Sequence, residues 1–358
     1  MSLLIDFNLT NITPNKNGDH LTNESRYSLV EFNHELYLKI IYSSVESDQE
    51  ETQLLSYHRK LNNWTISENH HLSTDKHLSL VPSNKTTDNQ GRLSKILESN
   101  KRIYTLKLAP NTINYSKEEN QPIIYVNIKH ELNQWQEANL WGFGDVNNKA
   151  ITEIVILNDS LYAATFNLER GFQIWKTIDL QQIPYHWQLI LSHGAYRYSL
   201  NQIVFFMVNF KGEIYLASGI SVANANIKNI GYPAGFELIR LYSDNDWDLI
   251  FGMPRFTPQG LKIPLTAQGP GLDDPNNHTV QCLVTHNERL YLGFQKVDGF
   301  QLWGTDDGET WQQLPVNELS HYYRVEVLDV LSTSLGLVFA VNVVEPNGVN
   351  QIQIWLGQ

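Results

Sequence analysis

The residues with the most evident chemical capability lie just before three apolar segments of the chain. Aromatic and basic side chains gather there: Tyr196, Arg197 and Tyr198 in HGAYRYSL, His278 in NNHTV, and Tyr322, Tyr323 and Arg324 in SHYYRV. Stacking, cation–π contact and charge-assisted hydrogen bonds from such side chains can hold a planar or anionic small molecule. The alternative is structural, with the rings filling a channel and the arginines facing water.

A second set of candidates occupies one recurring position inside the apolar segments. That position holds Ser28, Lys95, Glu153, Phe206, Cys282 and Asp329. In an enzyme, Glu153 or Asp329 would act as general base, and Arg197 or Arg324 would stabilise developing oxyanion charge. Lys95 is expected to contact substrate or to pair with one of the carboxylates. The alternative is a ring of partly solvated channel residues without chemistry.

The elements that must position these residues follow from an internal repeat. A polar turn followed by Leu-Tyr or a close equivalent occurs six times, at Leu36–Tyr37, Ile103–Tyr104, Leu161–Tyr162, Ile214–Tyr215, Leu290–Tyr291 and Leu337–Val338. Repeats of roughly 40 to 50 residues with about four strands each are typical of a β-propeller. The seventh and eighth residues before the second residue of each pair are all apolar, as expected for a core between blades.

The sequence therefore predicts an all-β chain that forms one β-propeller domain over residues 1–358, with six blades of four antiparallel strands. Seven blades are the alternative if residues 66–90 contain two further strands. The last repeat ends at its third strand, so the segment SLLIDFNL near the N-terminus is expected to supply the outer strand and close the ring.

Loop lengths indicate which end of the propeller is functional. The turns between first and second strands are short, whereas the second-to-third and blade-to-blade connections include residues 43–52, 110–122, 219–235, 67–90 and 252–278. The long connections share one end of an up-and-down blade, which we call the long-loop face, and the opposite end is the short-turn face. Function usually resides in long loops on a rigid scaffold, so we expect the site on the long-loop face, with residues 252–278 as a candidate lid.

Composition and motifs indicate which partners, location and cofactors to expect. A net charge of −12 argues against a nucleic-acid partner, and no run of about 18 apolar residues indicates a membrane partner. The chain has one cysteine, Cys282, and begins without a signal-peptide pattern, so the expected location is the cytoplasm. Asp273 and Asp274 lack calcium-loop spacing, and no nucleotide motif occurs, so neither a metal nor a cofactor is expected.

Two stretches resemble known propellers. GTDDGETW, residues 304–311, resembles the Asp-box of sialidase-type propellers, a turn brace in which Asp306 would accept backbone N–H groups. Residues 269–311 resemble the propeller domain of cyanobacterial Friedel–Crafts and other alkylating biosynthetic enzymes of the cylindrocyclophane and bartoloside type.

The second resemblance implies a function in secondary metabolism. Its members form carbon–carbon or carbon–oxygen bonds, so the expected function is bond formation or cyclisation of a natural-product intermediate, with an aromatic or acyl-chain substrate. Those enzymes have a further N-terminal calcium-binding domain, whereas this chain begins with blade-like sequence, so their catalytic residues do not carry over. The alternatives are a non-catalytic lectin or protein-interaction module and a glycoside hydrolase, which would need two paired carboxylates.

Overall fold

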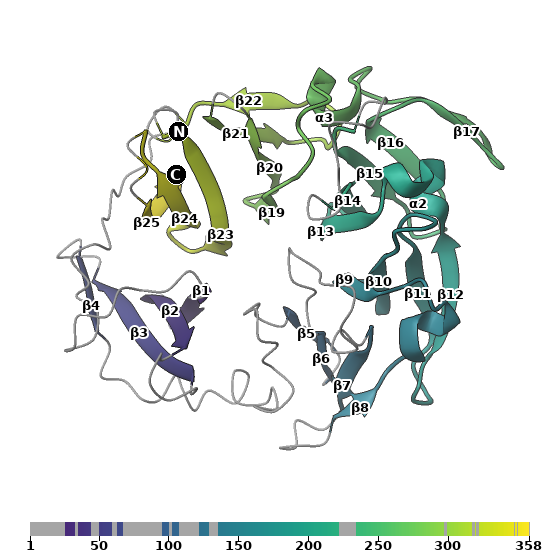
Figure 1. Ribbon diagram of the computed structural model, residues 1–358. Coiled ribbons are helices and arrows are strands. Elements are labelled where there is room, and N and C mark those ends of the chain that lie inside the picture. Colours follow the sequence, from purple (N-terminus) through teal and green to yellow (C-terminus); the bar gives the residue numbers. More distant parts are fainter. Residues whose placement is uncertain are drawn as a thin grey trace.

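Six antiparallel sheets lie in a ring in the computed structural model (Figure 1). The structure describes residues 26–32, 35–43, 50–58, 63–66, 95–99, 102–106, 122–128, 135–221, 234–296, 299–316, 319, 322–346, 348 and 350–357. Five of the sheets have four described strands and the last has three, and in each the strands pair in sequence order. The prediction of a six-bladed β-propeller is confirmed.

The strands follow the predicted repeat closely. The first two blades are β1 (Arg26–Phe32), β2 (Glu35–Ser43), β3 (Glu50–His58) and β4 (Asn63–Ile66), then β5 (Lys95–Ser99), β6 (Arg102–Leu106), β7 (Ile124–Asn127) and β8 (Gln136–Glu137). The next two are β9 (Ala150–Leu157), β10 (Ser160–Phe166), β11 (Ile174–Asp179) and β12 (His186–Leu191), then β13 (Ile203–Phe210), β14 (Glu213–Gly219), β15 (Glu237–Leu241) and β16 (Trp247–Phe251). The last two are β19 (Cys282–His286), β20 (Arg289–Lys296), β21 (Gly299–Thr305) and β22 (Gln312–Leu314), then β23 (Arg324–Thr333), β24 (Gly336–Val344) and β25 (Asn350–Gly357).

The core lies between blades rather than within them. Each of the five larger apolar clusters draws buried side chains from two neighbouring blades; for example, Tyr162 of blade three packs with Met207 and Trp247 of blade four. The repeated Leu-Tyr phrase opens the second strand of each blade, where Tyr162 lies opposite Val155 across the pair. Burial of both sheet faces explains why these strands are almost continuously apolar.

Blades six and one are joined by direct contacts. The Leu29 amide of β1 donates to Asp329 Oδ2 of β23 at 2.8 Å, and the Ser334 amide donates to Glu31 Oε1 at 3.1 Å. The N-terminal segment predicted to complete blade six lies outside the described residues. Among the described residues, no helix has the length and apolar character needed to cross a membrane.

Three blade-to-blade connections on the long-loop face share one local motif. Each contains a left-handed turn, in η3 (Trp141–Gly144), α2 (His193–Tyr196) and α3 (Pro270–Asp273), where three, four and three consecutive residues have positive φ. The carbonyl of the turn glycine accepts the side-chain amide of a later asparagine: Asn148 to Gly142 at 2.9 Å, Asn201 to Gly194 at 3.1 Å and Asn277 to Gly271 at 2.8 Å. We call this motif the Gly–Asn brace; it fixes the start of the next inner strand.

Residues 252–278 form an arm on blade four. A separate hairpin of β17 (Arg255–Thr257) and β18 (Gly260–Lys262) begins it, and Figure 1 shows β17 projecting beyond the ring. The chain then returns along the outer strand β16, where Leu265 N donates to Leu249 O at 2.9 Å and Thr266 N to Ile250 O at 3.1 Å. This return covers a sheet edge that would otherwise be open to unwanted pairing.

The Asp-box-like turn of blade five is a brace, but its carboxylate differs from the expected one. Asp307, not Asp306, accepts from Glu309 N at 2.8 Å, Thr310 N at 2.6 Å, Thr310 Oγ1 at 2.7 Å and Thr305 Oγ1 at 2.9 Å. Asp306 is exposed and lies 3.4 Å from Arg289 Nε. The turn's own amides therefore select the second aspartate, although the motif spacing pointed to the first.

Asp307→Ala is expected to destabilise the protein by about 1–2 kcal/mol, in the range measured for lost helix caps, because two backbone amides lose their acceptor. Despite some burial, which acts in the opposite direction, the hydrogen bonds from Thr310 and Glu309 lower the pKa of Asp307. The contribution of Asp307 to the free energy of unfolding is therefore complete above its unfolded pKa of about 4 and is lost on acidification. Urea unfolding measures the effect, with Asp306→Ala as control; equal losses for the two variants would contradict this assignment.

Candidate functional site

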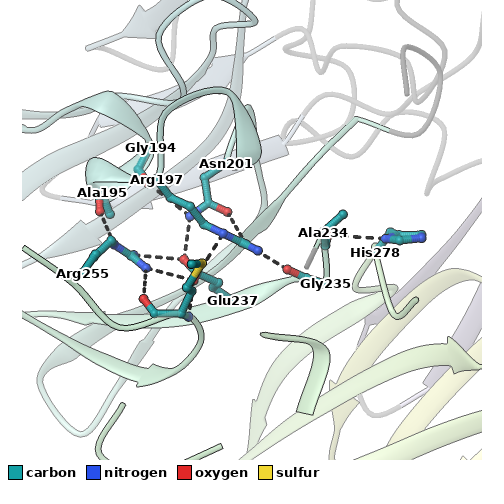
Figure 2. Close-up of polar contacts among 10 residues, drawn as sticks. Gly194, Ala195, Arg197, Asn201, Ala234, Gly235, Glu237, Arg255 and His278 are labelled. Carbon is teal, nitrogen blue, oxygen red and sulfur yellow. Dashed lines mark hydrogen bonds and ion pairs between the residues drawn. The ribbon is translucent and has the colours of Figure 1, made fainter. Parts of the chain in front are cut away.

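A buried charged cluster lies where the long-loop connections meet blade four (Figure 2). Glu237, at the start of β15, is completely buried. Its Oε1 accepts Arg255 Nη1 at 2.9 Å and the Met253 amide at 2.7 Å, and its Oε2 accepts Arg255 Nη2 at 2.9 Å and Asn201 Nδ2 at 2.7 Å. Arg197 Nε lies 3.5 Å from Oε1. One carboxylate thus joins three segments of chain.

The two arginines extend this network into the loops. Arg255 Nε donates to the Ala195 carbonyl of α2 at 2.6 Å, so the base of the hairpin is tied to the connection between blades three and four. Arg197, just before η4 (Tyr198–Leu200), donates through Nη1 to Gly235 O at 2.9 Å and to Asn201 Oδ1 at 3.2 Å. The cluster therefore holds the loops of blade four in one arrangement.

The cluster occupies a position that is neutral in other blades. Gln173, Gln301 and Gln353 stand at the equivalent place in GFQIW, GFQLW and IQIW, and each accepts the indole N–H of a tryptophan two residues later, at 3.0, 3.2 and 2.9 Å. Blade four has GFELI instead, with Glu237 and no tryptophan. A buried carboxylate needs cationic partners, and Arg197 and Arg255 supply them from the neighbouring loops.

The electrostatics of the cluster favour bracing over proton transfer. Burial alone would raise the pKa of Glu237, but the charges of Arg197 and Arg255 outweigh it and hold the pKa below its ordinary value. Burial lowers the pKa of Arg197, against the opposing attraction of Glu237. An enclosed, ionised carboxylate has no proton to donate near neutral pH, and these side chains are nearly inaccessible to a ligand.

The structure brings together only some of the residues predicted for the site. Tyr196 and Tyr198 lie around His193, with ring centroids 6.0 and 5.4 Å from it, beside the loop that carries Arg197. His278 is half-buried near the same cluster, and its Nδ1 lies 3.3 Å from Ala234 O (Figure 2). These residues form one neighbourhood at the entry to blade four and blade five.

The residues predicted at the entry to blade six are separate from this cluster. Tyr322 is buried between blades five and six, and its hydroxyl accepts Gln353 Nε2 at 2.8 Å. Tyr323 and Arg324 are exposed, and Arg324 Nη2 lies 3.3 Å from Glu326 Oε2. Of the three, Tyr323 presents the largest free apolar surface.

The predicted channel residues lie in the walls of the inner strands. Glu153 is buried in β9, and Asp329 accepts both the Leu29 amide and the Val330 amide, each at 2.8 Å. Lys95 belongs to β5, and its side chain lies outside what the structure describes. Asp329 therefore has a clear structural task, closing the ring between blades six and one.

Exposed apolar side chains are concentrated on the long-loop face. Twelve large apolar side chains are exposed among the described residues, and ten of them belong to the connections between blades. These ten are Leu140, Trp141, Val146, Tyr198, Met253, Phe256, Leu261, Ile263, Leu265 and Tyr323. Exposed apolar side chains gathered in one class of connection make those connections candidates for an interaction site. Two of these ten side chains, Tyr198 and Tyr323, were named from the sequence, and the other eight were not.

A cavity of about 510 Å³ lies at the opposite, short-turn face. It is lined by the first-to-second-strand turns of blades four and five and by blade six, including Asn209, Lys211, His286, Glu288 and Ser332. His286 Nδ1 lies 2.9 Å from Ser332 Oγ, and burial lowers the pKa of His286, which favours the neutral ring. The contact links blades five and six, and we assign it that structural role.

The described residues contain no group of three or more His, Cys, Asp or Glu side chains arranged to hold a metal ion. Cys282 is buried, and burial raises the pKa of its thiol to about 12, so it is protonated and unreactive at neutral pH.

Comparison with known proteins adds little beyond this geometry. No family model and no curated protein matches the chain. Among solved structures, the chain is similar to the β-propeller domain of the Trilobed protease from Pyrococcus furiosus, at 9% identity over 93% of this chain and 96% of the other, with a TM-score of 0.39. It is also similar to the acylaminoacyl peptidase of Pyrococcus horikoshii, at 9% identity over 94% of this chain and 52% of the other, with a TM-score of 0.48. A subtype N10 neuraminidase-like protein of A/little yellow-shouldered bat/Guatemala gives 11% identity over 93% and 95% of the two chains, with a TM-score of 0.42. The assignment of the propeller fold rests on the chain's own six sheets.

Proposed function

We propose that this propeller is a binding module whose long-loop face holds a protein partner with an apolar surface. The observation that carries the proposal is the concentration of exposed apolar side chains on the blade-to-blade connections, against two elsewhere among the described residues, Ile178 and Leu189. Leaving such side chains in water forgoes the free energy of their burial, which is about 1.5–3 kcal/mol for each fully buried one. A partner surface would recover it.

The buried charged cluster supports a binding role by fixing the shape of this face. Glu237 and its two arginines tie the hairpin of residues 255–262, α2 and β15 together, so the exposed side chains are presented in one arrangement. A preorganised surface loses less conformational entropy on association than a flexible one does. The cluster fixes the shape of the face and exposes no reactive group, which suits an interaction surface.

Carbon–carbon bond formation, the activity implied by the resemblance to biosynthetic propellers, has less support. That chemistry would need an accessible general base near the substrate. Glu153 is buried in its strand, and both carboxylate oxygens of Asp329 accept backbone amides. A small-molecule substrate with an aromatic or acyl chain would also need an apolar pocket, whereas the cavity described above is lined by polar turns.

Site-specific photo-crosslinking tests the binding role. Benzoylphenylalanine is placed at Trp141 or Tyr198 on the long-loop face, and at Lys211 on the short-turn face as a matched exposed control. Irradiation in an extract of the cells that make the protein should give one adduct of the same added mass from both long-loop positions and none from Lys211. Adducts from Lys211 alone, or from no position, would contradict the proposal.

A further inference from the structure

The arm on blade four has its polar and apolar sides reversed relative to an ordinary surface strand. Arg255 and Lys262 face each other across the hairpin and both lie over the ring of Trp247, at 5.6 and 5.1 Å from its centroid. Lys262 also donates to Asp246 Oδ1 at 3.1 Å and to the Trp247 carbonyl. The two cationic side chains therefore point inward, against blade four.

The apolar side chains of the same segment point outward. Phe256 and Leu261 are opposite one another in the hairpin and are 82% and 56% exposed. The alternation continues along the return segment, where Ile263 and Leu265 are 58% and 46% exposed while Lys262, Pro264 and Thr266 are less exposed. A half-buried strand normally buries its apolar face and hydrates its polar one. The observed pattern is the reverse, as expected for a strand whose outer face is covered in an assembly.

We propose that this apolar arm, residues 253–265, docks against the same arm of a second copy of the chain. The inference rests on the proposed function in one respect, namely that the long-loop face is the binding face. A symmetric dimer places one patch against itself, and the Phe256–Leu261 pair can meet its own copy across a two-fold axis. The two-stranded hairpin packs on blade four through its cationic face alone, so a second hairpin stacked on its apolar face would stabilise both.

The size of the patch fits a dimer of modest affinity. Its exposed apolar surface is on the order of 400 Å², comparable to the largest patch on a typical monomer. With its polar rim, the contact between two copies would bury about 1,000 Å², where the range of specific interfaces begins.

The charge of the patch favours a second copy over a lipid surface. Lys262 is the one charged residue between Phe256 and Gln268, and its ammonium is turned inward. The outer face therefore presents no like charge to an identical face, and the net charge of −12 acts only at distances that physiological salt screens. An anionic bilayer would gain no electrostatic attraction to this face, because the outer face has no basic side chain.

Sedimentation velocity of the full chain over a range of concentrations tests the inference. The mean mass of the wild-type protein should rise toward twice the monomer mass as the concentration increases, and the variant Phe256→Ser/Leu261→Ser should dimerise at least tenfold more weakly. Both positions are exposed, so circular dichroism and thermal melting should show an unchanged fold. Ile178→Ser removes a comparably exposed apolar side chain outside the blade-to-blade connections; it is the matched control and should remain dimeric.

Other outcomes separate this inference from the proposed function. A wild-type protein that is monomeric throughout, or a dimer that persists in the double variant, would overturn self-association. If the monomer still gives Trp141 or Tyr198 adducts with a different protein, the proposed function stands and the second copy is the wrong occupant. Wild-type monomer that cosediments with phosphatidylcholine vesicles, and loses this in the double variant, would assign the arm to membranes instead.

Discussion

Replacing Glu237 with glutamine is expected to destabilise the propeller by about 3–5 kcal/mol, the usual cost of removing one partner of a buried ion pair. The amide would leave Arg197 and Arg255 as buried cations without a counter-charge, at a position almost closed to water. Urea unfolding followed by tryptophan fluorescence measures the loss. The expected effect is large because two buried guanidinium groups lose their counter-charge; the lost hydrogen bonds contribute less.

Glu213→Gln is the matched control in the same blade. Glu213 also faces an arginine, with Oε2 at 3.6 Å from Arg240 Nε, but its side chain is partly exposed, and Asp248 and Glu309 remain to neutralise Arg240. A partly exposed pair with alternative partners contributes at most about 1 kcal/mol. Equal losses for the two variants would show that Glu237 is not a brace.

The stabilisation from Glu237 is also expected to depend on pH. The pKa of Glu237 in the folded protein lies below its unfolded value of about 4.3, so the unfolded state takes up the proton first. The stabilisation from Glu237 is therefore complete above about pH 5 and is lost as the pH falls through the lower, folded pKa. The difference in unfolding free energy between wild type and Glu237→Gln should shrink on acidification below about pH 4. A difference that grows in acid would contradict the direction of the shift.

Gly171→Ala is expected to cost about 3 kcal/mol or more, and Gly144→Ala only about 1–2 kcal/mol. Both glycines have a φ of +85°, so alanine at either position would be strained by the left-handed backbone. A Cβ on Gly171 would lie 2.4 Å from Tyr198 O and 2.6 Å from Gly194 N, whereas a Cβ on Gly144 would meet nothing within 4 Å.

The comparison isolates the close approach between the β10–β11 connection of blade three, which contains Gly171, and the α2 connection. The obstructing atoms are backbone atoms of the loop that carries Arg197, so relief would require moving that loop. Chemical denaturation gives both free energies, and the soluble yield ranks the variants if Gly171→Ala does not fold. Similar losses for the two would mean that the loop yields easily and is not held against the blade.

Much of the fold was predictable because its signal is local and repeated. The Leu-Tyr phrase marks a buried second strand in every blade, and its spacing to the preceding apolar pair reflects the hairpin register, as between Tyr162 and Val155. The Asp-box spacing identified the right turn but the wrong carboxylate. Asp306 and Asp307 are adjacent and of the same type, and only the folded turn shows that the backbone amides donate to Asp307.

The candidate site was less predictable, because its key contacts join distant segments. Glu237 could have been noticed by aligning GFQIW, GFELI and GFQLW, where it replaces a neutral glutamine. Nothing in that alignment says that Arg255, from an arm without a long apolar run, supplies its main partner. Likewise, the Gly–Asn brace recurs with spacings of six, seven and six residues, a signal that is clear only once the turns are superposed.

Hydroxyl-radical footprinting shows whether the long-loop face is a binding surface. Trp141, Tyr198, Phe256 and Tyr323 are exposed, readily oxidised reporters on that face, and His286 reports on the short-turn face. Oxidation rates are compared between dilute purified protein and protein in the extract of its own cells, normalised to an added reporter peptide. We predict that the four long-loop residues become several-fold less reactive in the extract while His286 is unchanged. Unchanged reactivity of all four residues, or protection confined to His286, would show that the long-loop face is not the binding surface.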